Sequence, residues 1–153
     1  MAAAARLESA ELRPEDELAR FIAEADGAGA VVSFVGIARP TSATGDTVTG
    51  LFLDHYPGMT ERSLQQIADD GLAGFDVSHV AVAHRCGDVR PGAPIVFAAA
   101  ASAHRRAAFL AADYLMDRLK TEAMFWKKEQ GPNGERWIEP TDGDRADAAR
   151  WSR

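Results

Sequence analysis

The chain has 153 residues, of which 46% are apolar and 26% are charged, and its net charge at pH 7 is −6. This size and composition are typical of one globular domain, and the acidic balance argues against a protein that binds nucleic acid or an anionic membrane surface. The chain has one cysteine, Cys86, and no long apolar run, so neither a disulfide scaffold nor a membrane helix is expected. We therefore expect a cytoplasmic protein.

Hydrophobic periodicity and turn residues divide the chain into nine predicted elements. In chain order these are a helix over 14–26, strands over 27–36 and 51–56, a helix over 57–74, strands over 76–87 and 93–102, a helix over 102–123, and hairpin strands over 125–130 and 136–140. Helices and strands mix without strict βαβ alternation, which indicates the α+β class. We expect one domain over 1–140 and a polar C-terminal tail over 141–153.

The start of the helix predicted over 102–123 carries candidate binding residues. Ser102 is a natural N-cap, which would place His104 and Arg105 in the first turn. Free backbone N–H groups and the helix dipole attract anions there, so basic side chains work against the dipole unless a phosphate or carboxylate binds. The alternative is that these basic side chains are simply solvated, and the sequence leaves both interpretations open.

The other end of the same helix carries Lys120, with Met116 one turn earlier. A lysine in the last turn suits the dipole, and a methionine there commonly fills a core, so structural roles explain each residue taken alone. Arg105 and Lys120 are fifteen residues apart, or roughly 22 Å along a helix. One small ligand cannot easily reach both ends. Either there are two sites, or two copies of the chain meet antiparallel and share each pocket, which we hold as a hypothesis.

The stretch FWKK, residues 125–128, places two lysines next to two aromatic residues. On a strand, Phe125 and Lys127 share one face, while Trp126 and Lys128 share the other. One lysine therefore points into the protein or a cleft, where partial desolvation would lower its pKa and let it exchange a proton near neutral pH. The alternative is an edge strand on which both lysines discourage aggregation.

Five potentially cationic side chains at the ends of predicted elements would form a polyanion pocket if they converge. They are Arg39, His104, Arg105, Lys120 and Lys127. The four histidines show no metal-ligand spacing, and no dinucleotide-binding, P-loop or nucleophile-elbow motif is present. We therefore expect neither a metal site nor a cofactor.

Five segments of the chain form a recognisable set: GAVVSFVGIAR (29–39), LDHYPGMTE (53–61), VAVAHRCGDVRPG (80–92), SAHRRAAFLAADYLMDRLKTEAMFWKKE (102–129) and GERWIE (134–139). The blocks Tyr-Pro-Gly-Met, Ser-Ala-His-Arg and Phe-Trp-Lys-Lys-Glu within them are together highly specific. By these segments the chain resembles the MoaE family, the catalytic large subunits of molybdopterin synthase. The chain departs from the family pattern at Pro40, which affects loop contacts, and at Met124, where a proline is common.

The resemblance implies an α/β-hammerhead-like α+β fold with a mixed or antiparallel sheet, packed helices and a C-terminal hairpin. It implies a homodimeric sulfurtransferase in which each large subunit binds one small ubiquitin-like sulfur carrier, giving a heterotetramer. The thiocarboxylated Gly-Gly tail of the carrier would deliver two sulfurs to cyclic pyranopterin monophosphate and form the dithiolene of molybdopterin. By the same resemblance, Lys120 and Lys127 are catalytic, Arg39, His104 and Arg105 contact the substrate, and Phe34 and Met116 are pocket walls.

Two other functions stand beside the sulfurtransferase. The first is a dimeric anion- or nucleotide-binding module whose lysines act only through their charge. The second is a phosphoester hydrolase that uses lysine and histidine, and the lack of a metal-ligand pattern and of a nucleophile counts against it.

Overall fold

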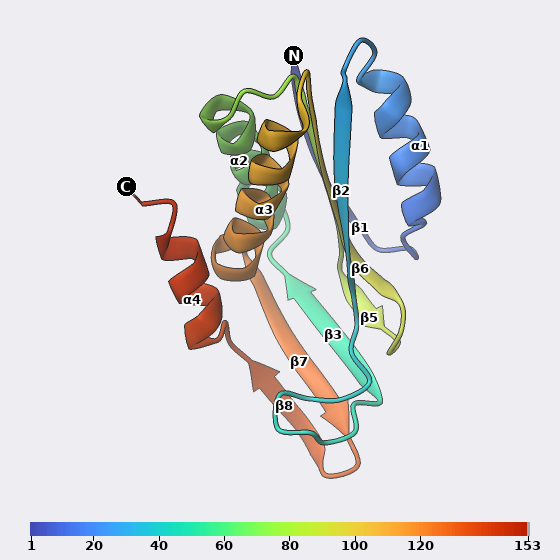
Figure 1. The fold of residues 1–153 in the computed structure, drawn as a ribbon. Helices are drawn as coiled ribbons and strands as arrows, with labels where there is room; N and C mark the ends of the chain where they lie inside the picture. The colour runs from blue at the N-terminus through green and yellow to red at the C-terminus, as the bar shows by residue number, and fades with distance from the viewer. Residues whose placement is uncertain (153) are drawn as a thin grey trace.

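The computed structural model describes residues 1–152, which form four helices and two four-stranded sheets (Figure 1). In chain order the elements are β1 (Ala2–Glu8), α1 (Pro14–Glu24), β2 (Ala30–Ile37), β3 (Gly50–His55), α2 (Met59–Gly74), β4 (His79–Arg85), β5 (Gly87–Val89), β6 (Pro94–Ser102), α3 (Arg105–Glu122), β7 (Phe125–Gly131), β8 (Gly134–Ile138) and α4 (Asp142–Ala149). The predicted α+β class is confirmed. No helix within residues 1–152 is long and apolar enough to cross a membrane.

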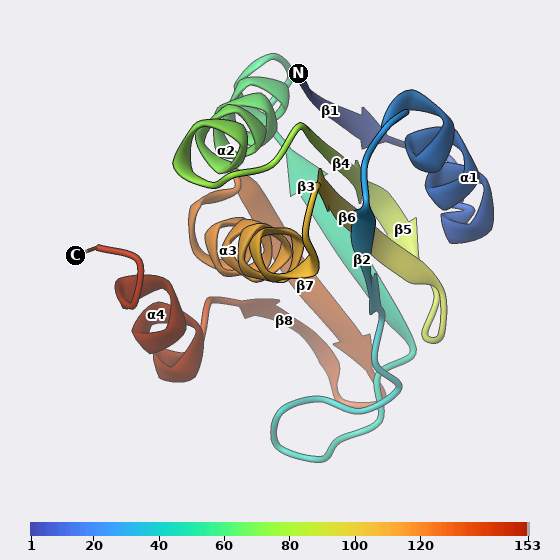
Figure 2. The same ribbon diagram turned by 45° about the horizontal axis from the view of Figure 1, so that its top comes forward.

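The two sheets differ in how they are covered. The first sheet has the strand order β1-β4-β6-β2, and the second has the order β5-β3-β7-β8. β1 runs parallel to β4 while the other strand pairs are antiparallel, so the first sheet is mixed. Helices α2 and α3 cover one face of this sheet and α1 covers the other (Figure 2). The hairpin of β7 and β8 predicted at the C-terminal end belongs to the second sheet, beside α4 (Figure 1).

Strand β6 is an inner strand of the first sheet, between β4 and β2, and its run of alanines explains how helices cover both faces. Successive side chains of a strand point to opposite faces. Ala98 and Ala100 pack in the core on the side of α2 and α3, whereas Ala99 and Ala101 pack with Phe21 of α1. All four alanines are fully buried. Small side chains on both faces let the helices approach the sheet closely.

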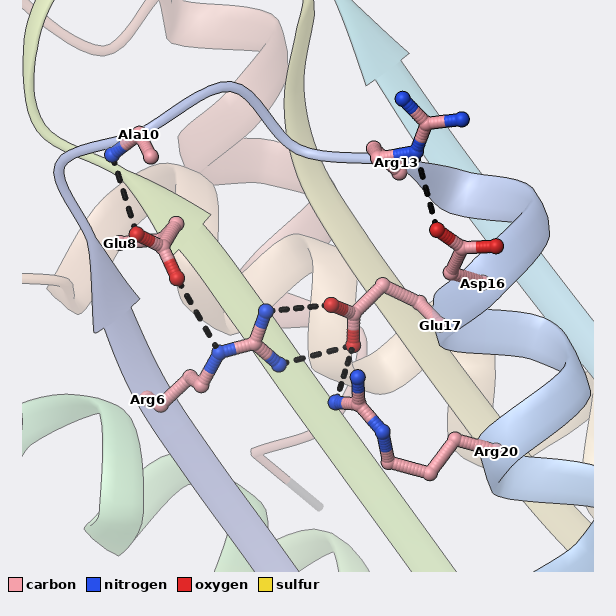
Figure 3. Close-up of polar contacts among 7 residues, drawn as sticks. All are labelled: Arg6, Glu8, Ala10, Arg13, Asp16, Glu17 and Arg20. Atoms are coloured by element: carbon pink, nitrogen blue, oxygen red, sulfur yellow. Dashed lines mark hydrogen bonds and ion pairs between the residues drawn. The ribbon is translucent and has the colours of Figure 1, made fainter.

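An ion pair ties the N-terminal strand to α1 (Figure 3). Both terminal nitrogens of Arg6 on β1 donate to the Glu17 carboxylate, with Arg6 Nη1 at 2.8 Å from Glu17 Oε2. Arg20 lies 3.7 Å from the same carboxylate. The hydrogen bonds from Arg6 hold the pKa of Glu17 below its usual range, against the opposing effect of burial. The buried Glu17 is therefore an ionised and paired group.

Three elements were not predicted from the sequence: β1, β5 and α4. The alanine-rich β1 has weak intrinsic strand propensity, and it forms because β4 offers it a parallel register from Ala2↔His79 to Glu8↔Arg85. At the other end of the chain, Thr141 caps the start of α4, and Trp151 packs edge-on against Phe75. The segment expected as a polar tail thus contains a helix that packs on the rest of the fold.

The predicted N-cap of α3 was wrong. Ser102 is the last residue of β6, where it pairs with Ala30, so the strand continues past the expected helix start. The helix begins at Arg105, and His104 is the N-cap residue without a side-chain capping bond. The Ser102 hydroxyl donates instead to the His104 carbonyl. Arg105 therefore occupies the first helical position and His104 precedes it.

Leu115 tests the packing of α2 against α3. Its side chain is fully buried, and a Cβ added to Gly71 would lie 2.8 Å from Leu115 Cδ2. We expect Leu115→Ala to lower the free energy of unfolding by about 2–5 kcal/mol through the cavity it leaves, as measured by urea denaturation. The matched variant Leu110→Ala removes a leucine of the same helix that is 41% exposed, and it should cost less than about 1 kcal/mol. Equal losses would contradict this packing.

Candidate functional site

A pocket of about 470 Å³ lies between the second sheet, the C-terminal end of α3, the loop after β2 and the start of α4. Half of its lining residues are apolar, and charged side chains from several elements also reach into it. The charged lining residues are Arg39, Lys120, Lys127, Glu129, Glu139 and Asp144. This combination of an apolar wall and convergent charged groups is typical of small-molecule sites.

Lys127 enters the pocket from the middle of β7. Phe125 and Glu129 lie on the same face of the strand and also line the pocket. On the opposite face, Lys128 Nζ lies 2.7 Å from the Glu135 carboxylate and 5.0 Å from the centre of the Trp137 ring. The prediction that one of the two lysines points into a cleft is confirmed. The edge-strand alternative is wrong, because β7 lies between β3 and β8.

The environment of Lys127 makes its ammonium group more acidic. Burial, helped by the positive charge of Lys120, lowers the pKa of Lys127 to about 8, while the charge of Asp144 acts in the opposite direction. A lysine with this pKa is mostly protonated at neutral pH but can lose a proton at small cost. Lys127 can therefore act as a proton donor or acceptor at physiological pH.

Lys120 and Arg39 complete the cationic part of the pocket. Lys120 lies in the last turn of α3, with a largely exposed side chain, and Arg39 lies in the exposed loop after β2. These three cations come from α3, β7 and a loop that are far apart in the sequence. An arginine stays protonated at all accessible pH values, so it can hold an anion but not exchange a proton.

His84 lies behind the pocket as an uncharged support. Its ring stacks on Phe125 with the ring centres 4.2 Å apart, and its Nδ1 is 2.8 Å from the Arg85 carbonyl. Burial, with a smaller effect from Lys127 and Lys120, lowers the pKa of His84 to about 3. The ring is therefore neutral at physiological pH. It packs beside Phe125 without adding a further positive charge near the lysines.

Four residues predicted for the site lie outside this pocket. His104 and Arg105 are at the opposite end of α3 from Lys120, as their sequence separation predicted. Phe34 is exposed on β2, and Met116 packs against the core of the first sheet. A single copy of the chain therefore brings together three of the seven predicted residues. The roles of the other four stay predictions, and those of His104 and Arg105 depend on a second copy.

The sequence patterns did not predict the three carboxylates of the pocket, which are Glu129, Glu139 and Asp144. Glu129 could have been found, because alternation places it on the same face as Lys127. Asp144 follows Thr141 at capping-box spacing, a signal for a helix start that the polar composition obscured. No signal marks Glu139. Within residues 1–152, no group of three or more His, Cys, Asp or Glu side chains is arranged to hold a metal ion.

Comparisons with known proteins agree with the resemblance seen in the sequence. The MoaE protein family matches residues 7–122. The molybdopterin synthase catalytic subunit of Caulobacter vibrioides is 50% identical over 131 residues, which cover 86% of this chain and 85% of that protein. A solved MoaE protein from Burkholderia ambifaria has a TM-score of 0.82 and 38% identity, covering 100% of this chain and 99% of the other. A complex of subunits 1 and 2 of molybdopterin-converting factor from Helicobacter pylori shares the fold, with a TM-score of 0.71 and 21% identity, covering 90% of each chain.

Removing the charge of Lys120 tests the electrostatics of the pocket. Because the charge of Lys120 lowers the pKa of Lys127, we expect Lys120→Met to raise that pKa above about 8. Competitive acetylation across a pH series, with the Lys127 peptide quantified by mass spectrometry, measures the midpoint. In the control Lys128→Met, which removes a lysine of the opposite strand face, the midpoint should stay near 8. A midpoint unchanged by Lys120→Met would show that the two ammonium groups do not interact.

Proposed function

The chain belongs to the MoaE family and is an enzyme of molybdopterin synthesis, and we propose that its pocket transfers two sulfurs to cyclic pyranopterin monophosphate. The observation that carries this proposal is the convergence of Lys120, Lys127 and Arg39 in one pocket, with the pKa of Lys127 lowered to about 8. The family membership supplies the reaction, and the geometry indicates which side chains serve it.

The reaction requires proton transfer at each sulfur insertion. A thiocarboxylate sulfur attacks a carbon of the substrate, an oxygen leaves that carbon and must be protonated, and water then cleaves the new thioester to release the carrier as a carboxylate. Lys127 is suited to give and take these protons, because a lysine of lowered pKa exchanges its proton near neutral pH. Lys120 lines the same pocket, and by the family resemblance it is proposed to share this role. Arg39 would hold the phosphate of the substrate by charge-assisted hydrogen bonds.

The sulfur is proposed to arrive on a small ubiquitin-like carrier subunit. The chain has one cysteine, and burial raises the pKa of the Cys86 thiol, which makes it a poor nucleophile. Sulfur delivered by a partner removes the need for a thiol in this chain. The Gly-Gly end of the carrier tail would enter the pocket with the least steric hindrance. The cytoplasmic location expected from the sequence stays a prediction.

A homodimer would explain the residues at the far end of α3. His104 and Arg105 cannot reach the pocket that contains Lys120 of the same copy, because Arg105 and Lys120 are fifteen residues, or roughly 22 Å, apart along α3. If two copies pack with antiparallel α3 helices, each pocket receives His104 and Arg105 from the other copy. These two residues would then add positive charge for the substrate phosphate.

The alternative of a binding module without catalysis is less well supported. A site that only binds an anion binds it more strongly when its lysines stay fully protonated. The partial burial and lowered pKa of Lys127 weaken such a site and favour proton exchange.

Lys127→Ala tests the proposed chemistry against a neighbouring lysine. With thiocarboxylated carrier and cyclic pyranopterin monophosphate, we expect Lys127→Ala to form dithiolene product at least about 100-fold more slowly, because a proton-transfer group is lost. Lys128→Ala should stay within about threefold of the unaltered protein, because Lys128 lies on the other face of β7. Product is measured by mass spectrometry. Equal losses in both variants would contradict a specific role for Lys127.

Mixing two inactive variants tests the shared pocket. We expect Arg105→Ala and Lys120→Ala each to have low activity, because each variant damages both pockets of its own dimer. After unfolding and refolding an equal mixture, half of the dimers should be mixed and contain one intact pocket, giving about a quarter of full activity. Activity no higher than that of the separate variants, with mixed dimers verified by native mass spectrometry, would place Arg105 and Lys120 in separate sites.

A further inference from the structure

Asp144 brings a negative charge into the pocket from α4, an element that the proposed chemistry does not use. Its side chain is partly buried and lines the same cavity as Lys120 and Lys127. Asp142, in the same turn of α4, is exposed and is not part of the cavity wall. The two aspartates therefore offer a matched pair in which one faces the lysines and the other faces solvent.

A capping box fixes the Asp144 carboxylate at the start of α4. The Thr141 backbone N–H donates to Asp144 Oδ2 at 2.9 Å, and the Asp144 backbone N–H donates to Thr141 Oγ1 at 3.0 Å. Such reciprocal bonds hold both side chains in one geometry. The carboxylate is thereby kept at one place on the pocket wall.

The other end of α4 is attached to the helix that carries Lys120. Arg150 Nη2 and Trp151 Nε1 each lie 2.6 Å from Asp117 Oδ2, on α3. Trp151 also packs edge-on against Tyr114, one turn before Asp117, with the ring centres 5.5 Å apart. Asp117 is itself one turn before Lys120, so the position of α4 is set relative to the lysine pair.

Charged side chains of both signs line the pocket that Lys127 enters, and Asp144 is one of them. Its carboxylate is the one that raises the pKa of Lys127, against burial and the charge of Lys120. Burial acts to raise the pKa of Asp144 itself, but hydrogen bonds within the Thr141 cap and the two lysine charges outweigh it, so Asp144 is ionised. The groups around Lys127 are Lys120 on α3, Arg39 after β2, Glu129 on β7, Glu139 after β8, Asp144 on α4 and neutral His84 on β4.

We propose that Asp144 is a positioning residue of the active site, whose fixed carboxylate holds Lys120 and Lys127 together against their mutual repulsion. It acts through the lysines and need not touch the substrate. The inference rests on the proposed function, since it assigns the lysine pair to proton transfer. Without the carboxylate, Lys127 should lose its proton at lower pH, and the pH range in which the pair works should move with it.

The variant Asp144→Asn tests this role with little change of structure. An asparagine oxygen can still accept the hydrogen bond from the Thr141 N–H, so the cap is kept while the charge is lost. We expect the acetylation midpoint of Lys127 to fall below about 8. We expect the inflection of the pH–rate profile for dithiolene formation to move to lower pH together with it. Both measurements use the full chain, and the second uses the thiocarboxylated carrier and cyclic pyranopterin monophosphate.

Two further variants separate charge from structure. Asp142→Asn removes the same charge from the exposed position and should leave the acetylation midpoint and the pH–rate profile unchanged. Asp144→Glu keeps the charge and should move both measurements back toward those of the unaltered protein. An unchanged Lys127 midpoint in Asp144→Asn, in a protein that still forms product, would overturn the inference and leave the proposed function intact. If the unaltered protein forms no product, the proposed function fails, and a shifted midpoint alone would not make Asp144 a catalytic positioning residue.

Discussion

The placement of two lysine ammonium groups in one partly enclosed pocket is the constraint on which the rest of the site depends. Like charges repel, and an ammonium group loses hydration when it is buried. Both effects lower the pKa of Lys127 to about 8. A flexible pocket would relieve this cost by turning Lys127 out to solvent, so the site requires rigid supports around Lys127.

The fold provides these supports from two separate layers. Lys120 extends from the end of α3, whose Leu115 and Leu119 are buried in the core that α2 and α3 share with the first sheet. Lys127 extends from β7, which is paired on both sides within the second sheet. Phe125, stacked on the neutral His84, connects the pocket wall to β4 of the first sheet. The two lysines are therefore positioned by different sheets, and the junction between the sheets sets the distance between them.

The sequence predicted those features that depend on local patterns. Period-two alternation was enough to place Lys127 and Lys128 on opposite faces of β7, and helical spacing was enough to find α1, α2 and α3. The sequence did not predict β1, because an alanine-rich strand forms only when the edge of a neighbouring strand is available. It also did not predict the true start of α3, because Ser102 belongs to β6, where it pairs with Ala30. The convergence of Arg39 with the two lysines and the position of Asp144 depend on tertiary packing, which no short-range pattern encodes. The proposed roles of His104 and Arg105 would depend further on contacts between two copies.

The most direct test of the central claim is the activity of Lys127→Arg with thiocarboxylated carrier and cyclic pyranopterin monophosphate, measured beside substrate affinity. Arginine keeps the positive charge but does not exchange its proton at accessible pH. If Lys127 transfers protons, the variant binds the substrate with nearly unchanged affinity and forms almost no dithiolene product. If the variant turns over at close to the rate of the unaltered protein, Lys127 serves only as a fixed positive charge, and the proton-transfer account is wrong.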